Sequence, residues 1–287
     1  MVIHWRYALA DVLYNLVWID ETGWGDWGDE YYTIYPDGVG IRKLTLWTSR
    51  LDRPREFQES IIVNQPGTKP EDNINTDAVI MVNMKGETCT YSWAKSIPRV
   101  IDKPNNANIE YINLKSNYKP FIIVSDKNPI FRPYYKKIIK RDYSIFPWWN
   151  HWPVAQIPSD GRWATGSDRA SHSSVTSGLE WVNYDSTETS ITRIMMHGLT
   201  DKSPVELVTL AKSWLRAPKL KLTSSAYNNE GFNLAERAYI LNCSCRNNPG
   251  ALEFEISASD EHPLVNPAFI VKGWGNADAI LKINGRN

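Results

Sequence analysis

The sequence predicts an all-β protein: a large antiparallel β-sandwich with one short amphipathic helix and a smaller C-terminal β-sandwich portion. Runs of alternating apolar and polar residues dominate the chain, which is typical of half-buried strands whose successive side chains point to opposite faces. Turn-forming segments rich in Gly, Pro and Asn separate these runs, for example at 65–67, 104–106 and 247–250. One segment alone has clear helical periodicity.

The first strand is predicted at 1–9. The strongest hairpin signal follows, where the runs 30–35 and 39–47 flank Pro36-Asp37-Gly38. Pro presets one turn dihedral and Gly supplies the left-handed one, so this tripeptide favours a tight turn between paired strands. Further strands are predicted at 57–63, 78–83, 87–93, 109–114, 121–124, 190–197, 252–258 and 268–272.

The helix is predicted to begin at Ser203-Pro204-Val205-Glu206, a capping box with Pro at the first helical position. Apolar residues recur at helical spacing over 207–215, and Pro218 ends the helix. We place the domain boundary after it, between a main β-sandwich at 1–217 and a smaller C-terminal portion at 218–287. Strand patterns run to both ends of the chain, so we expect a piece of a longer protein with its C-terminal portion truncated.

Charge and composition exclude several classes of protein. The 287 residues carry 32 Lys and Arg against 32 Asp and Glu, so no global charge draws the chain to nucleic acid. No run approaches the roughly 20 apolar residues of a membrane-spanning helix, and we expect no membrane insertion. The three cysteines, an odd number, argue against a disulfide framework.

Aromatic content gives the first indication of function. The chain has 13 Trp and 14 Tyr but only 7 Phe. Trp and Tyr combine a flat apolar face with a polar tip, which suits stacking on sugar rings and other hydrated ligands. A carbohydrate ligand is therefore the first hypothesis.

The segment 132–174 breaks the strand pattern and gathers most of the unusual residues. Long loops on a rigid β scaffold are where binding and catalytic groups concentrate. Trp beside amide, imidazole and guanidinium groups would form an apolar floor with convergent polar groups, as a carbohydrate cleft requires. The alternative is that His151 is a structural residue packed between aromatics. The predicted substrate-binding residues of this segment are Trp148, Trp149, Trp152, Gln156, Arg162 and Trp163.

Two charged segments offer further sites. The run 132–141 contains five basic residues interleaved with Tyr, which could hold a polyanion; nucleic acid and a solvated edge strand are the alternatives. The run 20–30 combines five carboxylates with Trp24 and Trp27, which we also predict to bind substrate. Its alternatives are sugar hydrogen bonds from Asp26 and Asp29, a paired-carboxylate glycosidase site and an ordered acidic turn. The ligand spacing of a calcium loop is absent.

The sequence lacks the motifs of several other types of chemistry. The sequence has no G-x-S-x-G elbow, P-loop, G-x-G-x-x-G before a helix or H-E-x-x-H. Serine-hydrolase, nucleotide and zinc-protease chemistry are therefore not indicated, and we predict no metal and no cofactor.

Three segments carry a family resemblance. His4-Trp-Arg-Tyr7, the run 30–39 and Asn266-Pro-Ala-Phe269 resemble the large β-sandwich ("supersandwich") region of bacterial uronate-acting polysaccharide lyases. The resemblance implies cleavage of a uronic-acid-containing polysaccharide by β-elimination, without a cofactor. It also implies an extracellular or periplasmic location as part of an exported parent protein, although no signal peptide is visible here.

The lyase reaction assigns roles to candidate residues. Asn150 and Arg169 would neutralise the uronate carboxylate, so that the neighbouring carbon becomes acidic. His151 would remove its proton, since a base with a pKa near neutrality is needed. Tyr184 or His172 would protonate the leaving oxygen, as a Tyr does in the enzymes that the chain resembles.

Two further hypotheses stay open. The chain could be a non-catalytic carbohydrate-binding or structural β-sandwich domain of a larger polysaccharide-degrading enzyme. A glycoside hydrolase that uses Asp26 and Asp29 is the third. Convergence of His151, Asn150 and Arg169 in one open cleft would favour the lyase.

Overall fold

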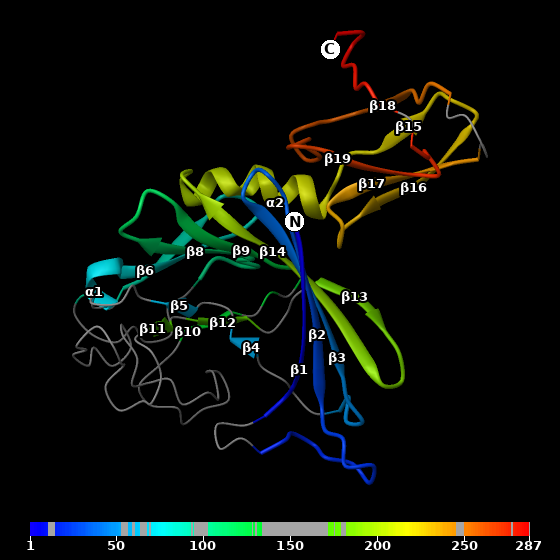
Figure 1. The fold of residues 1–287 in the computed structure, drawn as a ribbon. Coiled ribbons are helices and arrows are strands. Elements are labelled where there is room, and N and C mark those ends of the chain that lie inside the picture. The colour runs from blue at the N-terminus through cyan, green and yellow to red at the C-terminus, as the bar shows by residue number, and fades with distance from the viewer. Residues whose placement is uncertain are drawn as a thin grey trace. The chain divides into compact units, whose positions relative to one another are not determined.

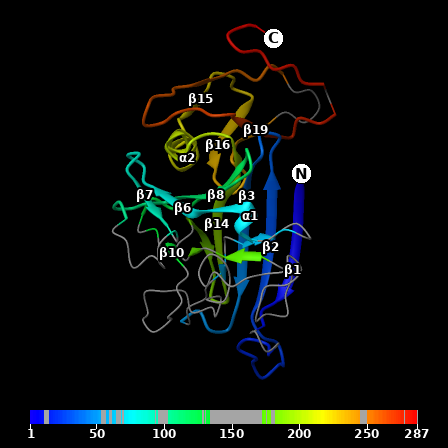
Figure 2. The same cartoon turned by 90° about the vertical axis from the view of Figure 1, so that its left-hand side faces the viewer.

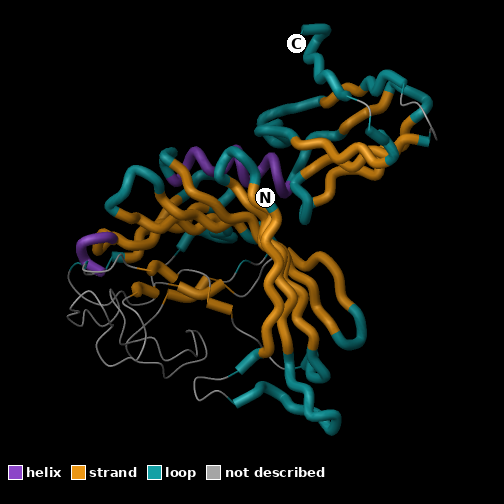
Figure 3. Tube along the Cα trace, in the orientation of Figure 1, coloured by secondary structure: helices purple, strands orange, loops and turns teal. Residues whose placement is uncertain are grey.

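The computed structural model gives the fold of the chain, drawn in Figure 1. It describes residues 1–287 apart from 11–14, 53–56, 59–60, 64–67, 69, 93, 95–102, 128, 130, 134–171, 175, 179–181, 245–249, 277 and 287. Strands account for most of the regular structure in the described residues, as Figure 3 shows. The all-β prediction is confirmed.

The described residues divide into two compact units, 1–211 and 212–287. A nine-stranded antiparallel sheet is the framework of the first unit. Its order is β1 (Val2–Ala8), β2 (Trp27–Ile34), β3 (Val39–Trp47), β14 (Ser190–Thr200), β9 (Lys119–Ile123), β8 (Ile109–Leu114), β6 (Ile74–Val82) and β7 (Thr88–Tyr91). The ninth strand, β13 (Val182–Ser186), pairs with the first part of β14, and β9 pairs with its second part.

The first unit also contains two small sheets and one helical turn. One small sheet has the order β10 (Phe131–Pro133), β12 (Thr176–Gly178) and β4 (Phe57–Gln58), and a second pairs β11 (His172–Ser174) with β5 (Ile61–Val63). The single strand predicted at 57–63 is thus two short strands in different sheets. One helical turn, α1 (Pro70–Asn73), leads directly into β6.

The predicted hairpin joins β2 to β3. Gly38 has φ +76°, the left-handed conformation that a side chain disfavours, and its amide donates to the Tyr35 carbonyl at 3.1 Å. The Asp37 carboxylate accepts the Val39 amide at 3.1 Å. This turn fixes the register of the two strands, which pairs Tyr32 with Arg42.

The predicted helix is also present. It begins with a 3₁₀ turn, η1 (Pro204–Glu206), and continues as α2 (Leu207–Leu215). Ser203 and Glu206 form the expected capping box, in which the Ser203 amide donates to the Glu206 carboxylate at 2.8 Å. Leu207 and Ala211 are buried on one side of the helix.

The second unit contains five strands among its described residues. β15 (Leu220–Leu222) pairs with β18 (Phe254–Ile256), while β17 (Ala238–Cys243) lies between antiparallel β16 (Tyr227–Asn233) and parallel β19 (Ala268–Lys272). Leu220, Tyr239 and Leu241 form the centre of its core. Residues 279–282 are irregular rather than the strand that the sequence suggested.

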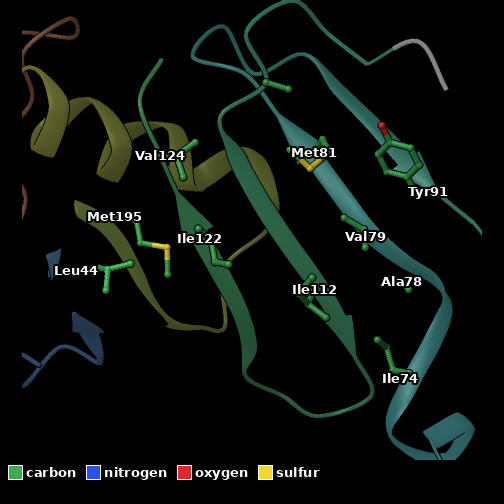
Figure 4. Close-up of a cluster of buried hydrophobic side chains, with 11 residues drawn as sticks. Leu44, Ile74, Ala78, Val79, Met81, Tyr91, Ile112, Ile122, Val124 and Met195 are labelled. Atoms are coloured by element: carbon green, nitrogen blue, oxygen red, sulfur yellow. The ribbon is translucent and has the colours of Figure 1, made fainter. Parts of the chain in front are cut away.

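One hydrophobic core cluster of the first unit lies on one face of the nine-stranded sheet. Figure 4 shows its side chains projecting from neighbouring strands. The strand registers place Leu44, Met195, Ile122, Ile112 and Val79 on the same face. Because strands alternate, the intervening residues face the other way. That opposite face also carries buried apolar residues, among them Ile41, Ile194 and Met196.

Candidate functional site

Alternation along β2 assigns the polar residues of this end of the sheet to two faces. Gly28, Glu30 and Tyr32 share the face of the core cluster that contains Leu44, and we call it the Glu30 face. Trp27, Asp29 and Tyr31 point the opposite way together with Lys43 of β3, and this is the Lys43 face. Adjacent residues of one strand thus belong to two separate sites.

A buried carboxylate forms the centre of the Glu30 face. The Glu30 side chain is fully buried and receives hydrogen bonds from Tyr7 at 2.6 Å and Tyr32 at 2.6 Å. Arg42 binds both of its oxygens, with Nη2 at 2.6 Å and Nε at 3.2 Å. We call Tyr7, Glu30, Tyr32 and Arg42 the Glu30 cluster. It connects β1, β2 and β3 through charge-assisted bonds.

Gly28 makes this arrangement sterically possible. A Cβ at Gly28 would lie 2.8 Å from the Tyr7 ring, so the ring occupies the space that any other residue would fill. Tyr7 can then extend over the backbone of β2 to reach Glu30. The glycine therefore serves the cluster rather than a turn.

Electrostatics keep the Glu30 cluster in one protonation state near neutral pH. Burial by itself would raise the pKa of Glu30, but Arg42 and the two tyrosine hydroxyls outweigh it and lower the pKa below the usual value. Burial and the hydrogen bond to Glu30 raise the pKa of Tyr7 far above that of a free tyrosine. A carboxylate with this many partners neither gives nor takes protons near neutral pH. The Glu30 cluster is therefore suited to holding the three strands in position rather than to acid–base chemistry.

His197 lies beside this cluster on β14. Its ring meets the Tyr32 ring edge-on, with 5.7 Å between centroids. Burial, and secondarily the positive charge of Arg42, lowers the pKa of His197 to about 4. Its Nε2 is buried without a hydrogen-bond partner among the described residues, and a Cβ at Gly40 would lie 3.1 Å from that atom. His197 is therefore neutral at physiological pH.

On the Lys43 face, Asp29 is held by two basic side chains of β1. Arg6 binds its Oδ2 at 3.0 Å, and His4 Nε2 binds its Oδ1. Burial would raise the pKa of Asp29, but these two partners lower it overall. Asp26 is also buried. The sugar hydrogen bonds predicted for these carboxylates would have to displace existing contacts at Asp29.

The predicted aromatic residues at 20–30 differ in environment. Trp27 stands between Arg6, 4.9 Å from its ring centroid, and Trp47, stacked at 5.1 Å with 8° between the planes. Both faces of its ring are therefore occupied by protein. Trp24 is 74% exposed. Of the two, only Trp24 offers a solvent-exposed ring.

A row of side chains crosses the Lys43 face. The His4 and Tyr31 rings stack 4.2 Å apart, and Lys43 Nζ lies 5.9 Å from the Tyr31 centroid and 5.7 Å from that of Tyr184. Tyr31 and Tyr184 are 37% and 40% exposed. Lys43 makes no ion pair with a described residue. We call His4, Tyr31, Lys43 and Tyr184 the Lys43 row.

Most of the site predicted from the sequence lies outside the described residues. Tyr184 is the one predicted catalytic residue with a described side chain, and it belongs to the Lys43 row. His172 begins β11, opposite Val63 of β5, but its side chain is not among those described. The predicted residues outside the described ranges are Trp148, Trp149, Asn150, His151, Trp152, Gln156, Arg162, Trp163 and Arg169.

Sequence reasoning missed the two groupings that the structure makes. Neither the Glu30 cluster nor Lys43 was singled out, although the hairpin register already placed Arg42 beside Tyr32.

In the described part of the chain, no three His, Cys, Asp or Glu side chains gather to hold a metal ion. Nor does this part contain a helix of the length and apolarity needed to cross a bilayer.

Comparison with known proteins adds no identity. No family model, no curated protein and no solved structure matches the chain. The resemblance to uronate-acting polysaccharide lyases therefore stays a prediction, and function is argued from the site alone.

Proposed function

We propose that the protein binds an anionic, uronate-containing polysaccharide on the Lys43 face of its nine-stranded sheet. The observation that carries this proposal is the position of Lys43 between two exposed tyrosines, without a carboxylate partner among the described residues. The proposal keeps the carbohydrate ligand expected in the sequence analysis but uses other residues, of which only Tyr184 was singled out there; the high Tyr and Trp content agrees with such a ligand.

The chemistry of the row suits a carboxylate on a sugar. An ammonium donates charge-assisted hydrogen bonds to a carboxylate, and the hydroxyls of Tyr31 and Tyr184 add neutral donors. The Tyr31 ring is flanked by His4 and Lys43, so the ligand meets ring edges and hydroxyls rather than an open aromatic platform. Asp29 does not compete for Lys43, because its oxygens bind Arg6 and His4.

Calorimetric titration with polygalacturonate tests the proposal, with dextran as the neutral control polymer. Lys43→Met keeps the length of the side chain and removes the charge. We expect it to weaken polygalacturonate binding about ten-fold or more, since a hydrogen bond to a charged group contributes roughly 1.5–3 kcal/mol. Lys221→Met, at an exposed position of β15, is the matched control and should bind as the native chain does. Equal affinities for the two variants would contradict the proposal.

Cleavage by β-elimination is a second proposal, favoured by the exposed position of Tyr184 beside Lys43. A bound uronate would then lie next to a predicted proton donor. The roles proposed for Asn150, His151 and Arg169 rest on the sequence alone. An exported parent protein would be the natural setting for such an enzyme.

Ultraviolet absorbance tests the second proposal, because elimination leaves a conjugated double bond and hydrolysis does not. We expect absorbance to rise when the native chain is mixed with a uronate polysaccharide, and to rise at least about a hundred-fold more slowly with His151→Ala. A flat trace despite measurable binding would contradict elimination and leave the binding proposal intact. Reducing ends without absorbance would indicate a hydrolase instead.

A further inference from the structure

We propose that the open edge of β1 is an interaction surface that pairs antiparallel with β1 of a second copy of this chain. β1 is the outermost strand of the nine-stranded sheet and, in the described part of the chain, pairs with β2 alone. Figure 2 shows it at that edge. Its seven residues run without Pro, Lys or a bulge, the features that commonly protect an edge strand from pairing.

The hydrogen bonds to β2 identify the residues that face outward. Met1 exchanges backbone bonds with Ile34, and the Leu9 amide donates to the Asp26 carbonyl, so odd-numbered residues bond toward β2. In an antiparallel ladder the alternate residues point their amides and carbonyls the other way. Val2, His4, Arg6 and Ala8 therefore present their backbone groups at the open edge.

One two-fold register satisfies all four of these residues. When Trp5 lies opposite Trp5 of the other copy, Val2 pairs with Ala8 and His4 pairs with Arg6, each pair exchanging two backbone hydrogen bonds. A shift by two residues in either direction leaves an end residue unpaired and sets His4 against His4 or Arg6 against Arg6. The strand sequence thus favours a single register with itself.

Side chains support the same register. Val2, Ile3 and Trp5 are 64%, 45% and 57% exposed, a concentration of apolar surface on one strand. Pairing would place Trp5 against Trp5 and Ile3 against Tyr7 on one face. On the other face each Arg6 is already neutralised by its own Asp29, so the two edges do not repel. The charge of each edge is therefore compatible with a second copy.

Interface size predicts a weak dimer. Seven residues per copy fall well below the roughly 20–30 residues a side of a standard stable interface. Self-association should therefore appear in sedimentation velocity only as the concentration of the full chain is raised. Trp5→Glu should raise the dimer dissociation constant about ten-fold or more by placing like charges at the two-fold axis.

Disulfide trapping tests the register directly. In the proposed pairing, Trp5→Cys brings two thiols opposite each other, with Cα atoms about 4.5 Å apart, within reach of a disulfide. Ile3→Cys is the matched control: its two thiols would lie about 13 Å apart along the strands and cannot bond. We expect oxidation to give covalent dimer with Trp5→Cys, and only the native level with Ile3→Cys.

Two results would overturn the proposal. One is a chain that stays monomeric and whose Trp5→Cys variant gives no more covalent dimer than Ile3→Cys, which would leave the edge to a strand of another protein. The other is preferential crosslinking of Ile3→Cys, which would require a different register. Polysaccharide binding at Lys43 is unaffected by either result.

Discussion

At the scale of single residues, the fold changes the protonation of His197 at mildly acidic pH. This residue is held neutral by burial beside Arg42, with a pKa of about 4 against an ordinary 6.5. The unfolded chain binds a proton at this residue below pH 6.5, whereas the folded chain does so only below about 4. The free energy of unfolding should therefore fall as pH decreases through this window, by on the order of 1 kcal/mol per pH unit.

Urea denaturation between pH 6.5 and 5 checks this dependence. Glu30 and Asp29, whose pKa values are lowered, stay ionised in the folded chain over that range and are largely ionised in the unfolded chain, so their contribution is small. His197→Gln removes the titrating group and should give a flatter profile of stability against pH. An unchanged slope in the variant would show that another group causes the dependence.

At the scale of secondary-structure elements, the Glu30 cluster joins three strands. Glu30→Gln keeps the size of the side chain but leaves Arg42, whose side chain is 12% exposed, without its counter-charge. Breaking a buried ion pair from one side typically costs 3–5 kcal/mol, so we expect a loss of about 3 kcal/mol in the free energy of unfolding. Chemical denaturation measures it.

The control for this variant is an exposed pair of the same unit. Asp52→Asn removes the charge from the ion pair with Arg50, whose members are 39% and 62% exposed, and should cost less than about 1 kcal/mol. Similar losses for Glu30→Gln and Asp52→Asn would mean that the Glu30 cluster does not tie the strands together.

The elements also show how far the sequence determines this fold. The runs predicted at 39–47, 109–114 and 268–272 coincide with β3, β8 and β19, because strong β-formers lie between clear turn signals. β15 and β16 were missed: β15 is very short, and β16 is rich in Asn, which does not favour strands.

The candidate site likewise depends partly on the local sequence and partly on pairing between distant segments. The turn at Pro36-Asp37-Gly38 fixes the register between β2 and β3, so the proximity of Tyr32 and Arg42 was accessible from the sequence. The positions of Tyr7 and His197 were not, because they depend on pairing across distant segments: β14 pairs with β3 from well over a hundred residues away. Long-range strand order has no local sequence signal.

At the scale of the whole molecule, the two faces of the nine-stranded sheet carry different groups of polar side chains. The Glu30 face holds the buried carboxylate cluster beside one hydrophobic core cluster, while the Lys43 face carries a lysine between two partly exposed tyrosines as well as buried apolar residues such as Ile194. This division explains why consecutive acidic residues, Asp29 and Glu30, have separate partners. It also makes a definite claim about recognition: the ligand is held by charge at Lys43.

The salt dependence of polygalacturonate binding tests that claim most directly. The dissociation constants of the native chain and of Lys43→Met are measured by calorimetry over a series of salt concentrations. We predict that affinity falls as salt rises for the native chain, because screening weakens exposed charge pairs, and that the dependence is distinctly shallower for Lys43→Met. Parallel salt dependences in the two chains would contradict the account.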